Sequence, residues 1–204
     1  MLNKTDIIKK QIKVRAYDNL PMVGKKKISR NYIINLFKQF EFKKGAEIGV
    51  FKGGFSRIML EQIPGLELLC VDKWVNHGHT KGSSSYKTAM DNLKNLNAII
   101  KNMPSIEAAA LVEDYSLDFV YIDAEHQFDG IMMDLILWSK KVKPGGIISG
   151  HDYKVNYQYG VIEAVNAYTR AHNVTEFFVT NKRGDAAPSF FWVNENNHNQ
   201  NYSK

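Results

Sequence analysis

Hydrophobic residues along the chain fall into short apolar runs that alternate with segments of helical period. The runs that end at Ile48 and that cover residues 66–71, 98–100 and 117–122 are bounded by polar residues or glycine. Such runs are typical of strands covered on both faces. Between them, apolar residues recur every three or four positions, which predicts amphipathic helices. This alternation predicts an α/β fold with a doubly wound, mostly parallel sheet.

The clearest repeat of this alternation covers residues 117–153. The strand at 117–122 is followed by a segment of helical period at 130–143, and the Pro-Gly-Gly at 144–146 is expected to end that helix. A second buried strand then starts at Ile147. A strand–helix–strand unit places both strands parallel, so their carboxyl ends meet at one edge of the sheet.

The last part of the chain has a different pattern. Residues 161–172 have helical period, and residues 175–180 and 189–193 form two alternating or apolar runs joined by a polar turn at 182–185. Two strands joined in this way predict an antiparallel hairpin at one end of the sheet.

The first 43 residues differ from the rest in charge. Residues 1–44 hold 12 Lys and Arg against 3 Asp and Glu, although the whole chain of 204 residues has a net charge of only +6. Helical segments are expected at 3–15 and 30–40. We therefore expect a basic helical segment at 1–43 that serves as a lid or dimer surface, a catalytic domain at 44–194 and a polar tail at 195–204.

Charge and composition also bear on partners and location. A basic segment is compatible with an anionic substrate, nucleic acid or a membrane, but a solvated face is the commoner explanation. The segment lacks the interleaved aromatic residues of a nucleic-acid platform, which argues against that partner. The apolar runs fall short of the ~20 residues that span a bilayer, and Cys70 is the only cysteine. We expect a cytoplasmic protein without a membrane partner.

Acidic and histidine side chains follow both strands of the 117–153 unit. Asp123 and His126 come after the first strand, and His151 and Asp152 come after the second. Because these strands end at the same edge, where open α/β sheets bind ligands, we expect the four side chains to lie close together. Each acid alone is equally compatible with a helix cap, and it is the paired placement that favours a reaction site.

A glycine-rich turn follows the first strand. Glu47 precedes Gly49, and Gly53 and Gly54 open a helix that contains Ser56. A glycine turn between strand and helix lets a ligand approach the backbone closely. The spacing is Gly-x-x-x-Gly-Gly and therefore differs from the Gly-x-Gly-x-x-Gly of dinucleotide-binding folds.

The next two strands end in candidate nucleoside contacts. Asp72 ends the second strand at a position suited to accept hydrogen bonds from a ribose diol, although it is also an ordinary strand-end acid. Lys73 and Trp74 follow, and an indole can stack on a flat ring. Met103 and Ser105, at the end of the third strand, are placed to lie against a base.

Residues 76–85 form a polar, glycine-rich loop that we expect to close over the substrate. The loop contains His77 and His79, but no regular element fixes their spacing. A metal site at these histidines is therefore the weaker hypothesis.

These motifs together resemble the class I S-adenosylmethionine-dependent methyltransferases. The resemblance covers about residues 44–193 and is strongest to the small O-methyltransferases that act on macrolide sugars and aminocoumarins and to the cephalosporin-hydroxylase-like proteins. It is carried by EIGVFKGGFS at 47–56, VDKW at 71–74, the long run at 120–153 and SFFWV at 189–193. It implies a seven-stranded sheet whose last strand is antiparallel.

The resemblance also implies roles for individual residues. Contacts to S-adenosylmethionine are expected from Glu47, Gly49, Gly53, Ser56, Asp72, Lys73, Trp74, Met103, Ser105 and Asp123. His126 corresponds to a general base, with Asp123 and His151 as further catalytic candidates. In metal-dependent members, residues matching Asp123, His151 and Asp152 bind Mg²⁺. Here a histidine replaces one acid of that set, and Mg²⁺ prefers oxygen ligands, so another divalent cation or a metal-free site is equally compatible.

The predicted function is methyl transfer from S-adenosylmethionine to a hydroxyl of a small molecule such as a sugar or a phenol. Three alternatives remain open at this point. They are a nucleic-acid methyltransferase, suggested by the basic segment, an NAD-dependent oxidoreductase, which shares the sheet and the strand-end acid, and a non-catalytic cofactor-binding module. A homodimer is compatible with the sequence.

Overall fold

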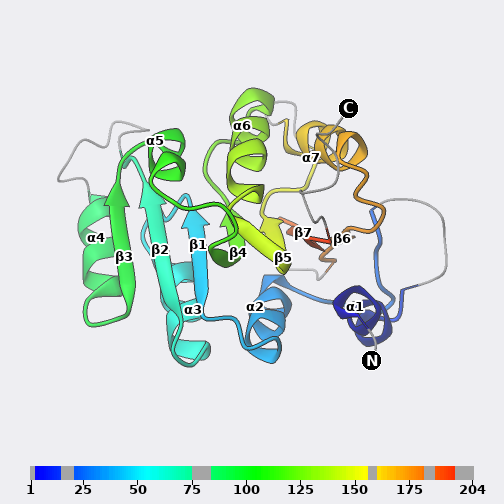
Figure 1. Ribbon diagram of the computed structural model, residues 1–204. Helices are drawn as coiled ribbons and strands as arrows, with labels where there is room; N and C mark the ends of the chain where they lie inside the picture. Colours follow the sequence, from blue (N-terminus) through cyan, green and yellow to red (C-terminus); the bar gives the residue numbers. More distant parts are fainter. Residues whose placement is uncertain (1–2, 15–20, 75–83, 156–159, 182–186, 196–204) are drawn as a thin grey trace.

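The computed structural model describes residues 3–14, 21–74, 84–155, 160–181 and 187–195. Its strands form one seven-stranded sheet in the order β3-β2-β1-β4-β5-β7-β6 (Figure 1). The strands are β1 (Lys44–Ile48), β2 (Glu67–Asp72), β3 (Ala98–Asn102), β4 (Leu117–Ile122), β5 (Val142–Gly150), β6 (Phe178–Val179) and β7 (Phe190–Val193). Strands β1 to β5 run parallel to one another, whereas β7 runs antiparallel to both β5 and β6. The predicted fold class, including the antiparallel last strand, is confirmed.

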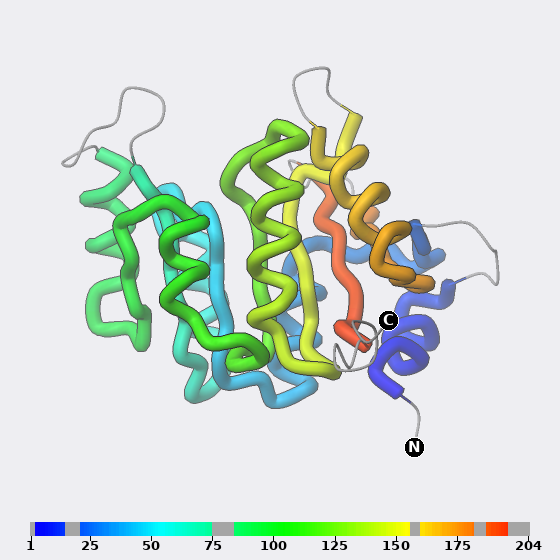
Figure 2. The backbone as a smooth tube through the Cα atoms, turned by 45° about the horizontal axis from the view of Figure 1, so that its top comes forward, coloured from blue at the N-terminus to red at the C-terminus, as the bar shows by residue number. Residues whose placement is uncertain are grey.

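Helices cover both faces of this sheet (Figure 2). They are α1 (Lys4–Ile12), α2 (Arg30–Gln39), α3 (Gly54–Gln62), α4 (Ser84–Leu93), α5 (Ser105–Ala110), α6 (Phe128–Ser139) and α7 (Val161–Ala171). The buried side chains of α1 to α4 belong to one hydrophobic cluster, and those of α5 to α7 belong to the other. The apolar run at 119–122 in β4 is covered on both faces, because Phe119 and Tyr121 face the first cluster while Val120 and Ile122 face the second.

The N-terminal segment packs onto the same core. Phe37 of α2 stacks on Phe119 of β4 with ring centroids 3.8 Å apart, and Ile8 and Ile12 of α1 are fully buried. Met22 forms a bridge with Phe178, so the segment also reaches the outer edge of the sheet. Its role as a lid or dimer surface stays a prediction.

The structure corrects two element boundaries. Helix α6 ends at Ser139 rather than near Lys143, and β5 already begins at Val142. The Pro-Gly-Gly at 144–146 therefore lies within an irregular strand, where Gly145 has a φ of 77° and the pairing with β4 shifts register. Helix α5 had no counterpart in the predicted element order. None of the described helices is both long and apolar enough to cross a membrane.

Candidate active site

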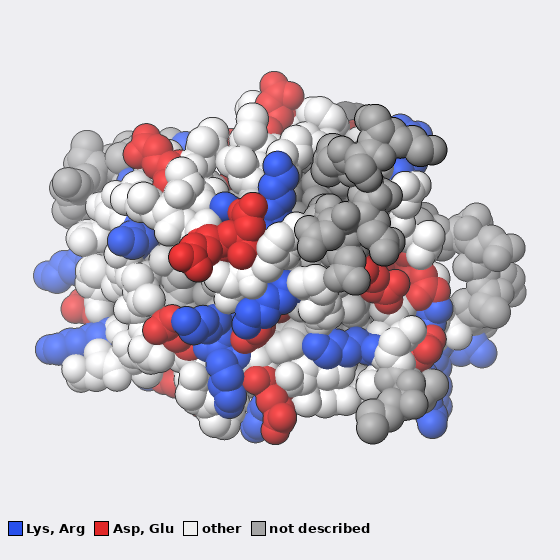
Figure 3. Space-filling view, viewed as in Figure 1, with Lys and Arg blue, Asp and Glu red and all other residues white. Residues whose placement is uncertain are grey.

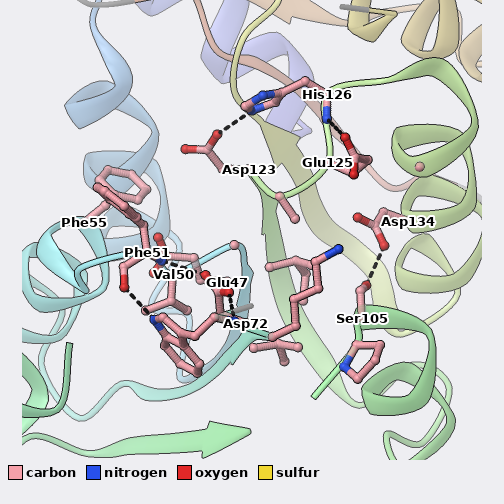
Figure 4. A pocket seen from close by; sticks show the side chains of 18 of the residues that line it. Glu47, Val50, Phe51, Phe55, Asp72, Ser105, Asp123, Glu125, His126 and Asp134 are labelled. Atoms are coloured by element: carbon pink, nitrogen blue, oxygen red, sulfur yellow. Dashed lines mark hydrogen bonds and ion pairs between the residues drawn. The ribbon is translucent and has the colours of Figure 1, made fainter. Parts of the chain in front are cut away.

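One cavity of about 870 Å³ opens at the carboxyl ends of β1, β2 and β4. Gly49 and Asp72 line it together with Asp123 and His126, so the glycine turn and two of the four acid–histidine residues face the same space, whereas His151 and Asp152 do not line it. A volume of this size lies within the range of small-molecule and cofactor sites. Figure 4 shows that His126 and Asp123 occupy one end of this space, while Asp134 and Ser105 form another wall.

The junction between β1 and β4 explains the glycine at position 49. Its φ is 93°, and a Cβ atom there would lie 2.1 Å from the carbonyl oxygen of Asp123. The Gly49 N–H donates to the carbonyl of Val71 at 2.8 Å, and the Asp123 N–H donates to that of Ile48 at 2.7 Å. The turn is thus held against two neighbouring strands, and the backbone borders the cavity.

Glu47 is a buried acid in the wall of this cavity. Only 2% of its surface is exposed, and it accepts a hydrogen bond from the hydroxyl of Ser56. Burial raises the pKa of Glu47 to about 8, and the hydrogen bond from Ser56 offsets this only in part. A cation that enters the cavity beside Glu47 would favour its ionised form.

Asp72 holds the turns on either side of it. One carboxylate oxygen accepts the N–H of Phe51 at 2.8 Å, and the other accepts that of Trp74 at 2.7 Å. Both of these aromatic residues have positive φ values, 52° and 45°, which is rare for bulky side chains. Each carboxylate oxygen keeps a lone pair for a further donor, so Asp72 can also bind a diol.

The other predicted nucleoside contacts also line the cavity, namely Lys73, Trp74, Met103 and Ser105. The indole N–H of Trp74 donates to the carbonyl of Phe51 at 2.7 Å, and its ring meets Tyr86 edge-on at 5.1 Å. These contacts fix the indole at the cavity wall.

The acid–histidine residues form a compact cluster. Nε2 of His126 lies 3.1 Å from Oδ2 of Asp152 and 3.6 Å from Oδ1 of Asp123. Nδ1 of His151 lies 3.3 Å from Oδ2 of Asp152 and 3.8 Å from Oδ1 of Asp123. The convergence that the strand–helix–strand unit predicts is therefore present.

The pKa shifts in this cluster favour the charged forms of His126 and Asp152, whereas the shift of Glu47 favours its neutral form. Hydrogen bonds to Asp123 and Asp152 raise the pKa of His126 to about 9, although burial acts against this. Burial alone would raise the pKa of Asp152, but hydrogen bonds from His126, His151 and Lys154 bring it well below the usual range. Asp152 also has a φ of 57°, a strained conformation of the kind that gathers at functional sites.

The same cluster has the donor set of a cation site. One ligand atom from each of Asp123, His126 and Asp152 lies within 4.8 Å of the others. Two carboxylates and an imidazole fit a divalent cation, and the mixed oxygen and nitrogen set suits Mn²⁺, Fe²⁺ or Zn²⁺ at least as well as Mg²⁺. His151 lies beside the same carboxylates.

Two predicted cofactor contacts lie behind the cavity wall. Gly53 caps the N-terminus of α3 with a φ of 72°, and Ser56 is fully buried with its hydroxyl on Glu47. Their contribution to binding would be indirect, through the shape of the turn and the position of Glu47. The predictions for His77 and His79 and for most of the 76–85 loop lie outside the described residues.

Sequence reasoning missed several residues that line the cavity. Arg30, the first residue of α2, reaches it from the N-terminal segment, and its guanidinium lies 4.8 Å from the ring centroid of Phe55. Asp134 of α6 lines the opposite wall and is only 3% exposed. Nothing in the local sequence connects Arg30 to the site. Asp134, in contrast, shares its helical face with Ile131 and Trp138, which marks it as a buried acid.

Charged side chains are interspersed on the face shown in Figure 3. Lysines, arginines and acidic residues lie next to one another there, without a continuous basic patch. Among the described residues, ion pairs such as Lys141–Asp114 and Lys143–Asp118 join side chains of opposite charge. This face therefore lacks the single-sign surface that is typical of nucleic-acid binding.

Comparisons with known proteins identify a family for this chain and solved structures that share its fold. The model of a family described as methyltransferase domain matches residues 46–153, just over half of the chain. No curated protein sequence gives a significant match.

Solved structures share the fold at low sequence identity. A candidate O-methyltransferase from Klebsiella pneumoniae is 16% identical with a TM-score of 0.60, and the alignment covers 91% of this chain and 86% of that one. A candidate caffeoyl-CoA O-methyltransferase from Staphylococcus aureus is 14% identical, with a TM-score of 0.59 and coverages of 94% and 93%. The tRNA (m1A58) methyltransferase TrmI from Aquifex aeolicus is 18% identical, with a TM-score of 0.57 and coverages of 82% and 70%.

The matched segment contains the glycine turn, Asp72 and the whole acid–histidine cluster. The sheet order and the antiparallel β7 agree with the fold that the resemblance implied. The chain belongs to the methyltransferase domain family, within the class I methyltransferases.

Proposed function

We propose that this protein transfers the methyl group of S-adenosylmethionine to a hydroxyl of a small molecule. The observation that carries the proposal is the single cavity that joins Glu47 and Asp72 to Asp123 and His126. A donor bound along the ends of β2 and β1 would present its methyl group toward the end of β4. Adjacent parallel strands are about 4.8 Å apart, so the distance from β2 to β4 suits a nucleoside joined to an amino acid.

The residues at β1 and β2 fit the polar parts of this donor. Asp72 would accept the ribose hydroxyls with the lone pairs left by Phe51 and Trp74. Glu47 would pair with the ammonium group, which would favour its ionised form despite its burial. The backbone at Gly49 lines the cavity, and the amino-acid part would lie beside it.

The residues at β4 and β5 fit the chemistry of a hydroxyl acceptor. A hydroxyl is a weak nucleophile unless its proton is removed as the methyl group transfers. His126 lies in the cavity wall and would accept that proton when neutral, with Asp123 and Asp152 orienting the ring. Alignment of the oxygen with the methyl group in one closed site would supply much of the acceleration.

A divalent cation is an optional part of this proposal. Asp123, His126 and Asp152 would hold it, with His151 as an additional nitrogen ligand. With a cation bound, His126 would be a ligand rather than the proton acceptor, and the cation would lower the pKa of the acceptor hydroxyl. Extensive dialysis against a chelator, followed by a thermal-shift assay with Mg²⁺, Mn²⁺ and Zn²⁺, tests the site. We expect an increase in Tm with at least one ion, and Asp152→Asn should abolish it.

Two alternatives are less well supported. The fold is shared with a tRNA methyltransferase at 18% identity, but the interspersed charges of Figure 3 do not favour nucleic acid. The glycine spacing at 49–54 and the family match argue against NAD.

Incubation with radiolabelled S-adenosylmethionine and a panel of sugars, phenols and tRNA tests the proposal. We expect label only in hydroxyl compounds of low molecular weight. Label in tRNA alone would overturn the acceptor class. Tight binding of S-adenosylmethionine without transfer to any compound would favour a non-catalytic module.

A further inference from the structure

The cavity contains a second buried acid that the proposed mechanism does not use. We infer that Asp134 selects the base of the bound donor by accepting a hydrogen bond from the exocyclic amine of adenine. This inference rests on the proposed function, because it names a specificity residue for the same methyl donor.

Two residues, one from α5 and one from α6, fix the position of this acid. The indole N–H of Trp138 donates to the hydroxyl of Ser105 at 2.7 Å, and that hydroxyl donates to Oδ1 of Asp134. Trp138 is fully buried, so the chain of hydrogen bonds is anchored in the core. Because the Ser105 hydroxyl already donates its proton to Asp134, it has none to donate to a ligand. Ser105 therefore positions Asp134.

The second carboxylate oxygen of Asp134 is available to a ligand. Figure 4 shows that this oxygen points away from Ser105 and toward the cavity. Among the described residues, Ser105 is the hydrogen-bond partner found for this side chain. Burial raises the pKa of Asp134 to about 6, so it keeps an ionised carboxylate at neutral pH, where a ligand donor would compensate its burial.

The surroundings of Asp134 suit a flat heteroaromatic ring. Met103, Pro104, Ile106 and Met133 line the cavity beside it and present apolar surface. Met103 also donates its N–H to the carbonyl of Asp72 at 3.1 Å, so this slot adjoins the ribose position. A ring in an apolar slot with one buried acceptor is recognised through its donor, and adenine carries such a donor in its exocyclic amine.

The inference is tested with a pair of ligands that differ only at this group. S-adenosylhomocysteine carries the amine, whereas its 6-deamino (purine riboside) analogue carries a hydrogen atom in its place and keeps N1 as an acceptor. Isothermal titration calorimetry of the full chain should give about 10- to 100-fold tighter binding of the adenosyl compound. In Asp134→Asn the side-chain amide can either accept or donate, so this preference should shrink to within a few-fold. Ser105→Ala should reduce the preference in part, because Asp134 would lose its anchor.

A matched variant separates this role from general damage. Glu47→Gln acts on the amino-acid part that both ligands share, so it should weaken both and leave their ratio unchanged. An unchanged ratio in a folded Asp134→Asn protein that still binds S-adenosylhomocysteine would overturn the inference and leave the proposed function intact. If the wild-type protein binds neither ligand, the proposed function fails and the inference fails with it.

Discussion

Two acids near one cavity have opposite charge preferences, although Glu47 lies in the cavity wall and Asp152 lies beside the wall residue His126. Glu47 is buried and lies near the acids Asp123 and Asp72, and its pKa rises to about 8. Asp152 lies against His126, His151 and Lys154, and its pKa falls well below the usual range. The same chemical group is thus favoured as a neutral acid at β1 and as a carboxylate at β5.

The difference follows from which group already has a cationic partner. Asp123 and Asp152 hold the imidazole of His126, whose pKa rises to about 9. Glu47 has the hydroxyl of Ser56 as its hydrogen-bond partner, and the attraction of Arg30 lowers its pKa by less than burial raises it. Under the proposed function, a cationic ligand would favour ionised Glu47 at β1, whereas the cluster at β4 and β5 would take part in proton transfer or bind a metal cation.

The largest effect should come from removing the imidazole of the cluster. His126→Ala should lower the rate of methyl transfer by about 10²–10⁴, because the acceptor loses its proton acceptor. The affinity for S-adenosylhomocysteine, measured by calorimetry, should change little. His172→Ala is a matched control, since this histidine stacks on Tyr168 at the end of α7 and away from the cavity. A wild-type rate in His126→Ala would refute the role of His126.

The pH dependence of donor binding should come next in size. The ammonium of the ligand stabilises ionised Glu47. Below the Glu47 pKa of about 8, Glu47 is therefore protonated in the free protein and releases its proton when the ligand binds. Affinity should therefore rise between about pH 6 and pH 8, by at most about tenfold per pH unit. In Glu47→Gln this dependence should be lost. Equal slopes in the two proteins would show that Glu47 does not ionise on binding.

The close approach of β1 to β4, next to Glu47 and Asp123, can be tested by a substitution at Gly49. Gly49→Ala should destabilise the protein by about 2–4 kcal/mol, because it combines an unfavourable φ with a clash against the carbonyl of Asp123. Gly54→Ala is the matched control, since a Cβ atom there meets nothing within 4 Å. Urea denaturation measures both changes. Equal stability of the two variants would contradict the close approach of β1 to β4.

The smallest of these effects should come from a substitution of Asp72, the residue proposed to bind the ribose hydroxyls. Asp72→Asn keeps one carbonyl acceptor for the strained turns but loses one acceptor for a diol. Binding of S-adenosylhomocysteine should weaken by about tenfold, as expected for one hydrogen bond to a charged group. Calorimetry measures this change, and wild-type affinity in a folded variant would count against the ribose role.

The sequence predicted the parts of the site that depend on strand order. Asp123 and Asp152 follow the two strands of one strand–helix–strand unit, so their convergence follows from the handedness and direction of that unit. Apolar runs covered on both faces likewise predicted the parallel sheet, as the opposite contacts of Phe119 and Val120 show.

Other features depend on tertiary contacts that have no local signal. The early start of β5 at Val142 depends on pairing with Leu117 and on the irregular geometry at Gly145. Arg30 reaches the cavity only because α2 packs on β4 through Phe37. Asp134 was recognisable in principle, because it lies on the buried face of α6, but its partner Ser105 is 29 residues away.

The most direct test of the account is a calorimetric comparison of S-adenosylhomocysteine and NAD on the wild-type protein. We predict that S-adenosylhomocysteine binds with one site per chain and that NAD binds far more weakly or not at all. Tighter binding of NAD would contradict the assignment of this cavity to a methyl donor.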